Sequence, residues 1–393
     1  MRKISIAEMF SNMGRAAIFL YFSHYLFSTT GVIWGVGLVL FLETLTSFLG
    51  PLIAGKIIDR YKPIYILKIS SSLLVVVGIF STLFVGSMND QYYIALISFV
   101  FSVFYPFIKA SVFCITPQLE AEGLSKANGQ LIYYSQLGQF SGMALAAWMM
   151  LELNLTQAIS VTTLIFFFAC LSYFSVEVTR ENLATNTKSM AVSGKVISRK
   201  EWLSFMPAIL LSISDLIAIF IFNVLLAALV TNRFHGQSTW MSILDACFAL
   251  GAAFGGWSVM KYFRPTFNSS VMAQALFCIY LLAVLFSNSD VLIIASILVW
   301  GASLSTSRSY WNTVMHSKIP SHNIGFCFGI QNILASSAVL IVNGVLSTAF
   351  NGGFEQALIY AFLIMVFITC SMVVVGMLRS FRAVLHVDGM ADS

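Results

Sequence analysis

Long apolar stretches alternate with short polar breaks from one end of the chain to the other. About 20 consecutive apolar residues span a bilayer as an α-helix, because a rise of about 1.5 Å per residue must cover about 30 Å of hydrocarbon. The breaks are rich in charged residues, Gly, Pro and Asn. They predict twelve membrane-spanning helices, near residues 4–27, 32–54, 66–87, 92–116, 129–151, 154–176, 204–231, 238–260, 268–286, 289–315, 325–350 and 354–378.

One polar interval, residues 177–203, is much longer than the others. It divides the chain into an N-terminal half at 1–176 and a C-terminal half at 204–378, followed by a tail at 379–393. Each half contains six predicted spans. This arrangement predicts an internal duplication with a central loop between the two copies.

Composition supports a membrane protein. Of the 393 residues, 59% are hydrophobic and 9% charged, whereas soluble domains carry about 25% charged residues. The net charge of +5 comes from cations spread thinly over the breaks, so we expect no nucleic-acid partner. The six cysteines lie in apolar stretches without CxxC spacing, which predicts free packing thiols and no metal site. The fold class expected is an all-α protein in a lipid bilayer.

The positions of the basic residues predict the orientation, because basic loops are retained on the cytoplasmic side. By the span count, almost all loop cations fall on one face, and Arg233 alone falls on the other. The cations of the first face are Arg2, Lys3, Lys56, Arg60, Lys62, Lys68, Lys126, those of the central loop, Lys261, Arg264, Lys318, Arg379 and Arg382. We therefore expect both termini and the central loop in the cytoplasm, and the protein in a bacterial cytoplasmic membrane.

The break after the second span carries a recognisable motif. The segment 50–61 reads Gly-Pro-Leu-Ile-Ala-Gly-Lys-Ile-Ile-Asp-Arg-Tyr, in which Gly55 is followed four residues later by Asp59 and Arg60. This resembles the loop signature of the major facilitator superfamily. The signature usually continues Gly-Arg-Lys, where this chain has Lys62-Pro63-Ile64. The resemblance implies a gating role for the loop, in which Asp59 helps to lock the cytoplasmic ends of the two halves together.

Two further segments resemble the macrolide-efflux and siderophore-export branch of that superfamily. After span four stand Thr116-Pro117-Gln118-Leu119 and Leu124-Ser125-Lys126-Ala127-Asn128-Gly129; after span ten stand Ile319-Pro320 and Ile324-Gly325. Their matching places in the two halves support the duplication. The resemblance implies a monomeric transporter without a bound cofactor, which works by alternating access and exports a drug or a siderophore.

Ionisable residues within the spans are candidates for function, because a charge at bilayer depth costs about 2.5–3.5 kcal/mol or more. Glu8 lies near the cytoplasmic end of span one. The carboxylates Glu43, Asp215 and Asp245 are candidates for carrying a coupling proton, since desolvation favours their protonated form. Candidate substrate contacts are the cations and polar side chains of the expected cavity helices: Arg15, Lys109, Arg308, Tyr134, Gln136 and Gln331.

These residues leave alternatives open. The buried cations could bind an anionic substrate through charge-assisted hydrogen bonds, or they could neutralise the buried carboxylates. Lys109 and Arg308, which correspond between the halves, could also extend to the inner interface. A proton-coupled importer would show the same helices, and a receptor would not need charges in both halves. No HExxH, GxSxG or Walker-type pattern appears, so we do not expect an enzyme.

The orientation gives a first prediction: both termini face the cytoplasm, because nearly all loop cations lie on that side. Fusions of the C-terminus to a reporter active only in the cytoplasm, and to one active only in the periplasm, measure it. A C-terminal fusion active in the periplasm would show that one span is miscounted.

Overall fold

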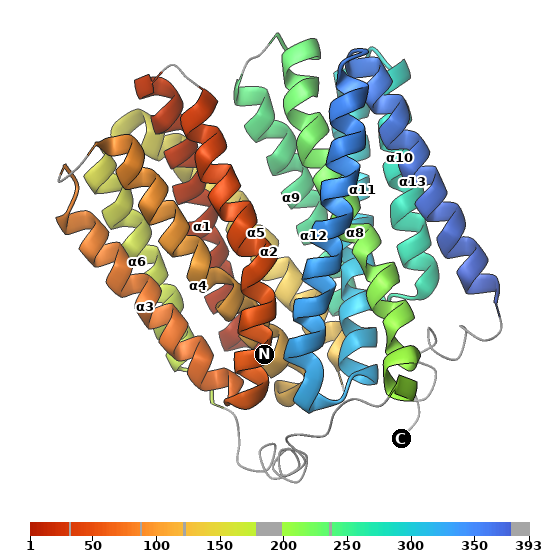
Figure 1. The fold of residues 1–393 in the computed structure, drawn as a ribbon, viewed down its shortest axis with the longest axis horizontal. Helices are drawn as coiled ribbons and strands as arrows, with labels where there is room; N and C mark the ends of the chain where they lie inside the picture. The colour runs from red at the N-terminus through yellow and green to blue at the C-terminus, as the bar shows by residue number, and fades with distance from the viewer. Residues whose placement is uncertain (31–32, 87–88, 121–122, 178–198, 236–237, 379–393) are drawn as a thin grey trace. The chain divides into compact units, whose positions relative to one another are not determined.

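The computed structural model describes residues 1–30, 33–86, 89–120, 123–177, 199–235 and 238–378. Within these ranges the chain is all α-helical, with one short 3-10 turn at Ser321–Asn323 (Figure 1). The central loop at 177–203 lies largely outside the described residues, as does the tail at 379–393. The helices are α1 (Arg2–Thr30), α2 (Ile33–Arg60), α3 (Pro63–Leu83), α4 (Asp90–Leu119), α5 (Leu124–Glu152), α6 (Leu155–Phe174), α8 (Arg199–Arg233), α9 (Ser238–Lys261), α10 (Phe267–Phe286), α11 (Asp290–Lys318), α12 (Ile324–Phe350) and α13 (Phe354–Met377).

These helices coincide one for one with the twelve predicted spans. In the described residues, nine of them are long and apolar enough to cross a membrane: α3, α4, α6 and α8 to α13. The helices α1, α2 and α5 have similar lengths, of 29, 28 and 29 residues. Arg15 on α1 and Gln136 on α5 are polar residues of the kind that lower the mean hydropathy of a helix.

Local capping explains why several helices begin at the polar breaks. The Asn89 side chain accepts a hydrogen bond from Gln91 N–H before α4, and Ser289 accepts one from Leu292 N–H before α11. Before α6, Asn154 and Gln157 form a reciprocal capping box. These side chains satisfy N–H groups that have no partner within the helix. The caps of α4 and α11 are each followed by an Asp in the first turn, at corresponding places in the two halves.

The helices group into two compact units by their contacts. The first contains residues 1–121, 134–194 and 321–333, and the second contains 122–133, 195–320 and 334–393. Each unit is therefore built mainly from one half of the sequence. The segments 122–133 and 321–333 are exceptions, since each packs with the unit formed by the other half. The division of the chain into two duplicated halves stays a prediction.

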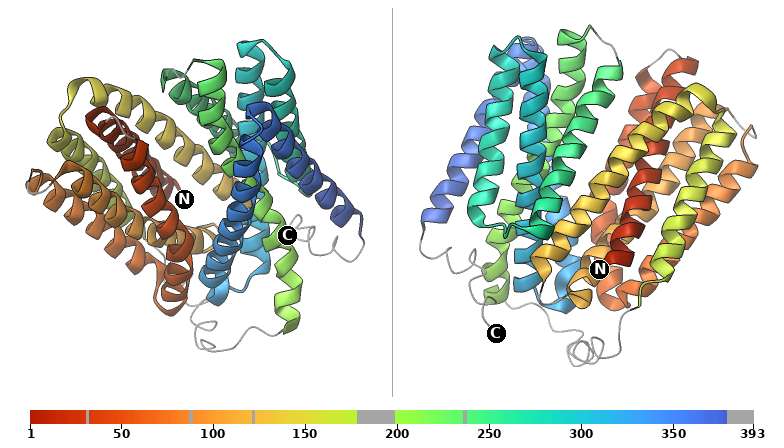
Figure 2. Two further views of the ribbon diagram at one scale, coloured as in Figure 1. Left: turned by 45° about the horizontal axis from the view of Figure 1, so that its top comes forward. Right: turned by 180° about the vertical axis from the view of Figure 1, so that it is seen from behind.

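Within the first unit, α1 packs on α2 and α6, while α4 packs on α2 and α3 (Figure 2). Within the second, α11 packs along α9 and α10, and α10 also contacts α13. The contact between α9 and α11 is close because glycines face the neighbouring backbone. A Cβ atom at Gly255 would lie only 2.1 Å from Ala302 O, and one at Gly251 only 2.2 Å from Leu298 O. Small residues thus let the two backbones approach.

An aromatic cluster forms the core of the second unit. The Trp300 ring of α11 lies 4.4 Å from that of Phe277, 5.0 Å from that of Phe248 and 5.1 Å from that of Phe222, between ring centroids. These rings come from α8, α9 and α10, so one buried tryptophan joins four helices. Rings at such spacings stabilise a core beyond the area that they bury. The cluster fixes the helices that carry Asp215, Asp245 and Arg308.

Candidate functional site

Asp59 lies at the end of α2, against the beginning of α12, and both belong to the first unit. Its carboxylate accepts hydrogen bonds from Gly325 N–H at 2.9 Å and from Phe326 N–H at 2.7 Å. The first N–H groups of a helix lack partners within it and carry a partial positive charge, so they favour an anion. The structure therefore connects two of the sequence motifs, the loop after span two and the Ile324-Gly325 segment.

The same ends of α2 and α12 approach closely at glycines. A Cβ atom on Gly55 would lie 2.1 Å from Gly325 O, and one on Gly329 would lie 2.8 Å from the Leu52 Cα atom. No other residue type fits such spacings without a shift of the backbone. On the neighbouring α4, the Phe113 ring packs on Phe328 of α12 with 4.9 Å between centroids. Arg60, the third residue of the predicted gating loop, is exposed in the last turn of α2.

Packing around Asp59 changes its protonation. Burial raises its pKa from 3.8 to about 6, and the two backbone hydrogen bonds oppose the shift without cancelling it. The buried thiols of Cys114 and Cys327 lie near enough to interact with it electrostatically. Since the pKa is raised, the contact between α2 and α12 is most stable below the ordinary pKa, and this contribution is lost as pH rises through about 6. A pKa shift of two units changes the equilibrium between the closed and the separated α2–α12 contact by at most about a hundredfold.

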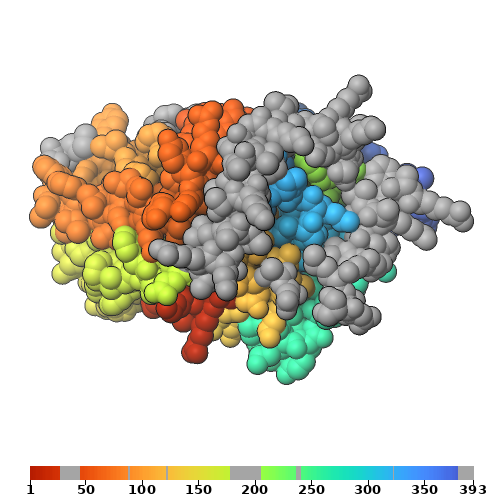
Figure 3. Space-filling view, turned by 90° about the horizontal axis from the view of Figure 1, so that it is seen from below, coloured from red at the N-terminus to blue at the C-terminus, as the bar shows by residue number. Residues whose placement is uncertain are grey.

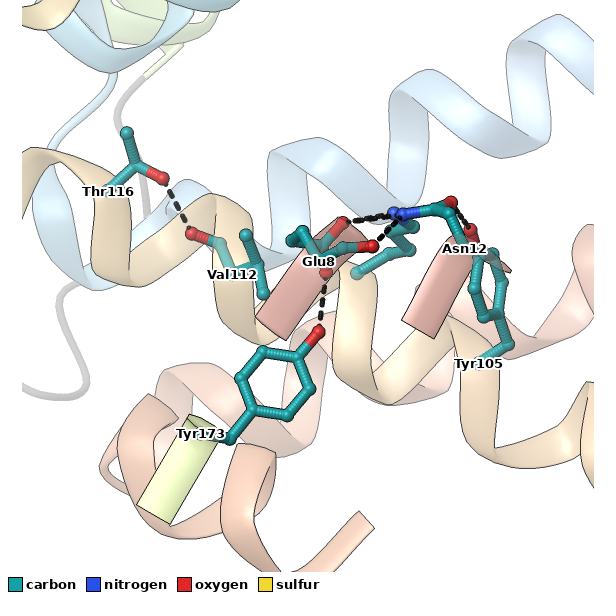
Figure 4. A network of polar contacts seen from close by, with 7 residues as sticks. Glu8, Asn12, Tyr105, Val112, Thr116 and Tyr173 are labelled. Carbon is teal, nitrogen blue, oxygen red and sulfur yellow. Dashed lines mark hydrogen bonds and ion pairs between the residues drawn. The ribbon is translucent and has the colours of Figure 1, made fainter. Parts of the chain in front are cut away.

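A buried polar network lies among α1, α4 and α6 of the first unit (Figure 4). Glu8, 3% exposed, forms an ion pair with Lys109 and accepts a hydrogen bond from the Tyr173 hydroxyl at 2.7 Å. The Asn12 amide donates to the other Glu8 oxygen at 3.2 Å, and its own oxygen accepts from the Tyr105 hydroxyl at 2.9 Å. Three helices thus supply donors to one carboxylate.

This network determines the surroundings of two predicted substrate contacts. The charge of Lys109 is compensated by Glu8, a carboxylate other than the three considered as its counterions. The Arg15 guanidinium carbon lies 4.1 Å from the centroid of the Tyr105 ring, and the Lys109 ammonium lies 5.1 Å from it. Both are cation–π contacts. The structure therefore brings Arg15 and Lys109 together at one aromatic ring.

The remaining candidates of the first unit are spread over three helices. Tyr134 and Gln136 are half-buried on α5, and Gln331 is buried on α12. Within the described residues, the buried Gln136 Oε1 atom has no hydrogen-bond partner. The side chain of Glu43, on α2, lies outside those that the structure describes.

A second buried carboxylate, Asp215 of α8, lies in the second unit and is 2% exposed. It accepts hydrogen bonds from the Gln274 amide of α10 at 2.7 Å and from the Ser307 hydroxyl of α11 at 2.8 Å. Ser307 is in turn 2.8 Å from the Ser270 hydroxyl. Neutral donors from two neighbouring helices therefore surround this carboxylate, as buried polar groups require.

Asp245 and Arg308 differ from Asp215 in their partners. Arg308 follows Ser307 on α11, is exposed, and acts on Asp215 electrostatically from beyond salt-bridge distance. Asp245 is half-buried on α9. Among the described residues, neither side chain has a hydrogen-bond or ion-pair partner. In the same residues, no three His, Cys, Asp or Glu side chains come together as ligands of a metal ion.

Of the residues in these sites, Asn12, Tyr105, Tyr173, Gln274 and Ser307 were not singled out from the sequence as functional. Glu8, Asn12 and Arg15 recur at helical spacing on α1, and Tyr105 and Lys109 are four residues apart on α4. That spacing places them on shared faces and was a usable signal. Gln274 and Ser307 gave no comparable signal, because isolated Ser and Gln residues are common in membrane helices and bond locally.

The described residues form twelve long helices, most of them apolar enough to cross a membrane, with charged groups buried among them, as expected for an integral membrane protein. The profile of the Major Facilitator Superfamily matches residues 4–343. The chain belongs to this superfamily, whose members are transporters and not, in general, enzymes.

Solved structures show the same fold at low sequence identity. A bacterial homologue of the iron transporter ferroportin, in an outward-facing state with soaked iron, is 15% identical over 95% of this chain and 98% of its own, with a TM-score of 0.70. The human organic anion transporter MFSD10 is 14% identical over 94% and 98%, with a TM-score of 0.76. The E. coli fucose:proton symporter FucP is 14% identical over 94% and 98%, with a TM-score of 0.64. No curated protein sequence matches this chain.

The contact of Asp59 with α12 gives a second prediction. Replacing Asp59 by Asn should lower the transport rate while equilibrium substrate binding is unchanged, because the contact lies at the end of the helices. The variant should also lose the dependence of the α2–α12 contact on pH near 6. Transport and binding in proteoliposomes between about pH 5 and pH 8 measure both effects.

The exposed Glu120, just after α4, provides a matched control, since Glu120→Gln removes one carboxylate outside this contact. Loss of binding by a folded, inserted Asp59→Asn protein would make the gating role untenable.

Proposed function

We propose that this protein exports a small anionic or amphipathic molecule, such as a drug or a siderophore, across a bacterial cytoplasmic membrane in exchange for protons. The two halves would expose the substrate site alternately to either side. One observation carries the proposal. Arg308 and Asp245 are ionisable side chains of membrane helices, and neither has a hydrogen-bond or ion-pair partner among the described residues.

The physical argument rests on the cost of a charge in the bilayer. An ionised side chain at bilayer depth costs about 2.5–3.5 kcal/mol or more unless it meets water, a counterion or a ligand. Lys109 meets this requirement within the protein through Glu8. Among the described residues, Arg308 forms no hydrogen bond or ion pair and acts on Asp215 only from a distance, so an aqueous cavity and an anionic ligand are the surroundings that suit it. A guanidinium can hold a carboxylate through two parallel hydrogen bonds.

The same comparison separates the candidate carboxylates. Asp215 is enclosed and accepts hydrogen bonds from two neighbouring helices, which supports a structural role. Asp245 is half-buried and accepts no hydrogen bond from the residues that the structure describes. A coupling carboxylate must meet water from each side in turn, and its protonation must not disrupt the helix packing. Asp245 meets these conditions better, and Glu43 stays a candidate.

The direction of transport rests on the resemblance of the loop segments to efflux proteins. The structural relatives include a protein named as a fucose:proton symporter and one named as an organic anion transporter. Proteins with this fold therefore include both proton symporters and transporters of anions. A proton-coupled importer is the alternative function. Uptake by inverted membrane vesicles but not by intact cells supports export, and the reverse supports import.

The third prediction separates the two carboxylates of the second unit. Asp245→Asn should abolish accumulation driven by a pH gradient while substrate exchange without a gradient continues. Asp215→Leu should instead lower the yield of folded protein, because the buried donors of Gln274 and Ser307 would lose their acceptor, at a cost of about 1–3 kcal/mol. Fluorescence-detected size exclusion and proteoliposome transport measure the two effects. Full gradient-driven transport by Asp245→Asn, Asp215→Asn and Glu43→Gln alike would exclude this coupling scheme.

The fourth prediction concerns substrate charge. Arg308→Gln should weaken binding of an anionic substrate at least about tenfold more than binding of its neutral ester, since a charge-assisted hydrogen bond contributes about 1.5–3 kcal/mol. Arg264→Gln, which removes an exposed cation beyond the end of α9, is the control. Arg15→Gln tests the second guanidinium in the same way. Equal losses for acid and ester would show that these residues support the fold instead of recognising ligand charge.

A further inference from the structure

The beginning of α5 contains a buried asparagine that the function proposed above does not use. Asn128, 1% exposed, lies in the segment 122–133, which packs with the second unit. Its amide nitrogen is 3.1 Å from the Thr313 hydroxyl and 3.4 Å from His316 Nδ1, both on α11. These contacts join a helix of the first half of the sequence to one of the second half.

The hydrogen bonds of Thr313 fix the direction of the Asn128 amide. The Thr313 hydroxyl donates its only hydrogen to Ser309 O at 2.7 Å, so it can only accept from Asn128. The NH₂ group of Asn128 therefore faces both Thr313 and His316. To accept from this NH₂ group, His316 Nδ1 must be unprotonated, with the ring proton on Nε2. The observed arrangement thus needs a neutral His316.

The same helix start is held by its backbone as well. A Cβ atom on Gly129 would lie 2.9 Å from Met260 N of α9, and one on Gly256 would lie 2.9 Å from Gly129 O. The Ser309 hydroxyl donates to Ser125 O at 3.3 Å. A glycine crossing and an adjacent polar side chain therefore occur together here, as they do at Gly55 and Asp59.

We infer that Asn128 is the positioning residue of a latch, a contact of α5 with α9 and α11 that closes only while His316 is neutral. A proton on Nδ1 would turn this acceptor into a donor and set it against the Asn128 NH₂ group. Rotation of the amide would not restore the contact, because its oxygen would then face the oxygen of Thr313. The inference rests on the proposed alternating access, in which the latch opens once per cycle.

The charged residues that the structure describes at these ends of α5, α9 and α11 are cations. Lys126 is on α5, Lys261 ends α9, and Lys318 ends α11. Histidine changes its charge in the physiological range, unlike these lysines. A change of pH between about 5.5 and 7.5 leaves the three lysines charged, and histidine is the side chain type whose charge such a change can alter.

Hydrogen–deuterium exchange of the full-length protein in lipid nanodiscs tests the latch without a substrate. Amide exchange of residues 124–133, corrected for the intrinsic effect of pH, should be about fivefold faster at about pH 5.5 than at about pH 7.5. Asn128→Ala should show fast exchange at both values. His316→Asn, which keeps an acceptor near the Nδ1 position and cannot be protonated there, should show slow exchange at both.

Asn128→Asp provides the sharpest outcome. Its carboxylate can accept a hydrogen bond from a protonated His316 but can no longer donate to Thr313. The pH dependence should therefore invert, with slower exchange at about pH 5.5 than at about pH 7.5. A merely structural role for Asn128 predicts no such inversion.

Asn232→Ala is the matched control, since the Asn232 amide donates only to Ala228 O within its own helix. Slow exchange of α13 in every variant verifies that the protein is folded. Two results would contradict the latch. The first is amide exchange in Asn128→Ala at the same rate as in the control. The second is a His316→Asn protein whose exchange keeps the pH dependence of the parent protein. Because no transport is measured, failure of the proposed export would be seen separately, as absent gradient-driven transport by the parent protein.

Discussion

A charged or hydrogen-bonding group among apolar helices needs a partner, because neither lipid nor a hydrocarbon core can replace water around it. This constraint organises both units. In the first, Glu8 gathers donors from α1, α4 and α6. In the second, Asp215 gathers them from α10 and α11. Each unit is thus held together inside by one carboxylate that several helices share.

A second feature follows from the need for the backbones to approach. Gly55 and Gly325 let α2 and α12 meet closely, and Gly129 and Gly256 do the same for α5 and α9. Next to each crossing stands one polar side chain: Asp59 accepts hydrogen bonds from the start of α12, and Asn128 contacts Thr313 of α11. Contacts built from glycine and one polar side chain can separate without the rearrangement of interlocked side chains.

The fold could be predicted from the sequence almost completely, because the length of an apolar stretch is dictated by the bilayer. Helix ends were less certain: α8 begins at Arg199, five residues before the predicted span, since its first turn is polar and extends beyond the apolar stretch. The family motif drew attention to Asp59. Its partners could not be foreseen, because they are backbone N–H groups more than 260 residues away, which no side-chain pattern marks.

The charged candidates show a similar limit. Lys109 was singled out for its depth, yet its role depends on Glu8, which lies 101 residues away on another helix. Pairing of helices decides which charges are compensated, and it cannot be deduced from the position of one residue within its span. Arg308, which corresponds to Lys109 in the other half, has no hydrogen-bond or ion-pair partner among the described residues.

The backbone nature of the Asp59 contact has a consequence for genetics. An ion pair between two side chains can be lost by one mutation and regained by exchanging the charges at the second position. Asp59 binds the amide groups of Gly325 and Phe326, and every residue except proline provides such a group. Loss of the carboxylate at position 59 therefore cannot be compensated by a charge change at the partner positions, because the partners are backbone groups. Suppressor mutations would have to act elsewhere, by changing the balance between conformations instead of repairing the contact.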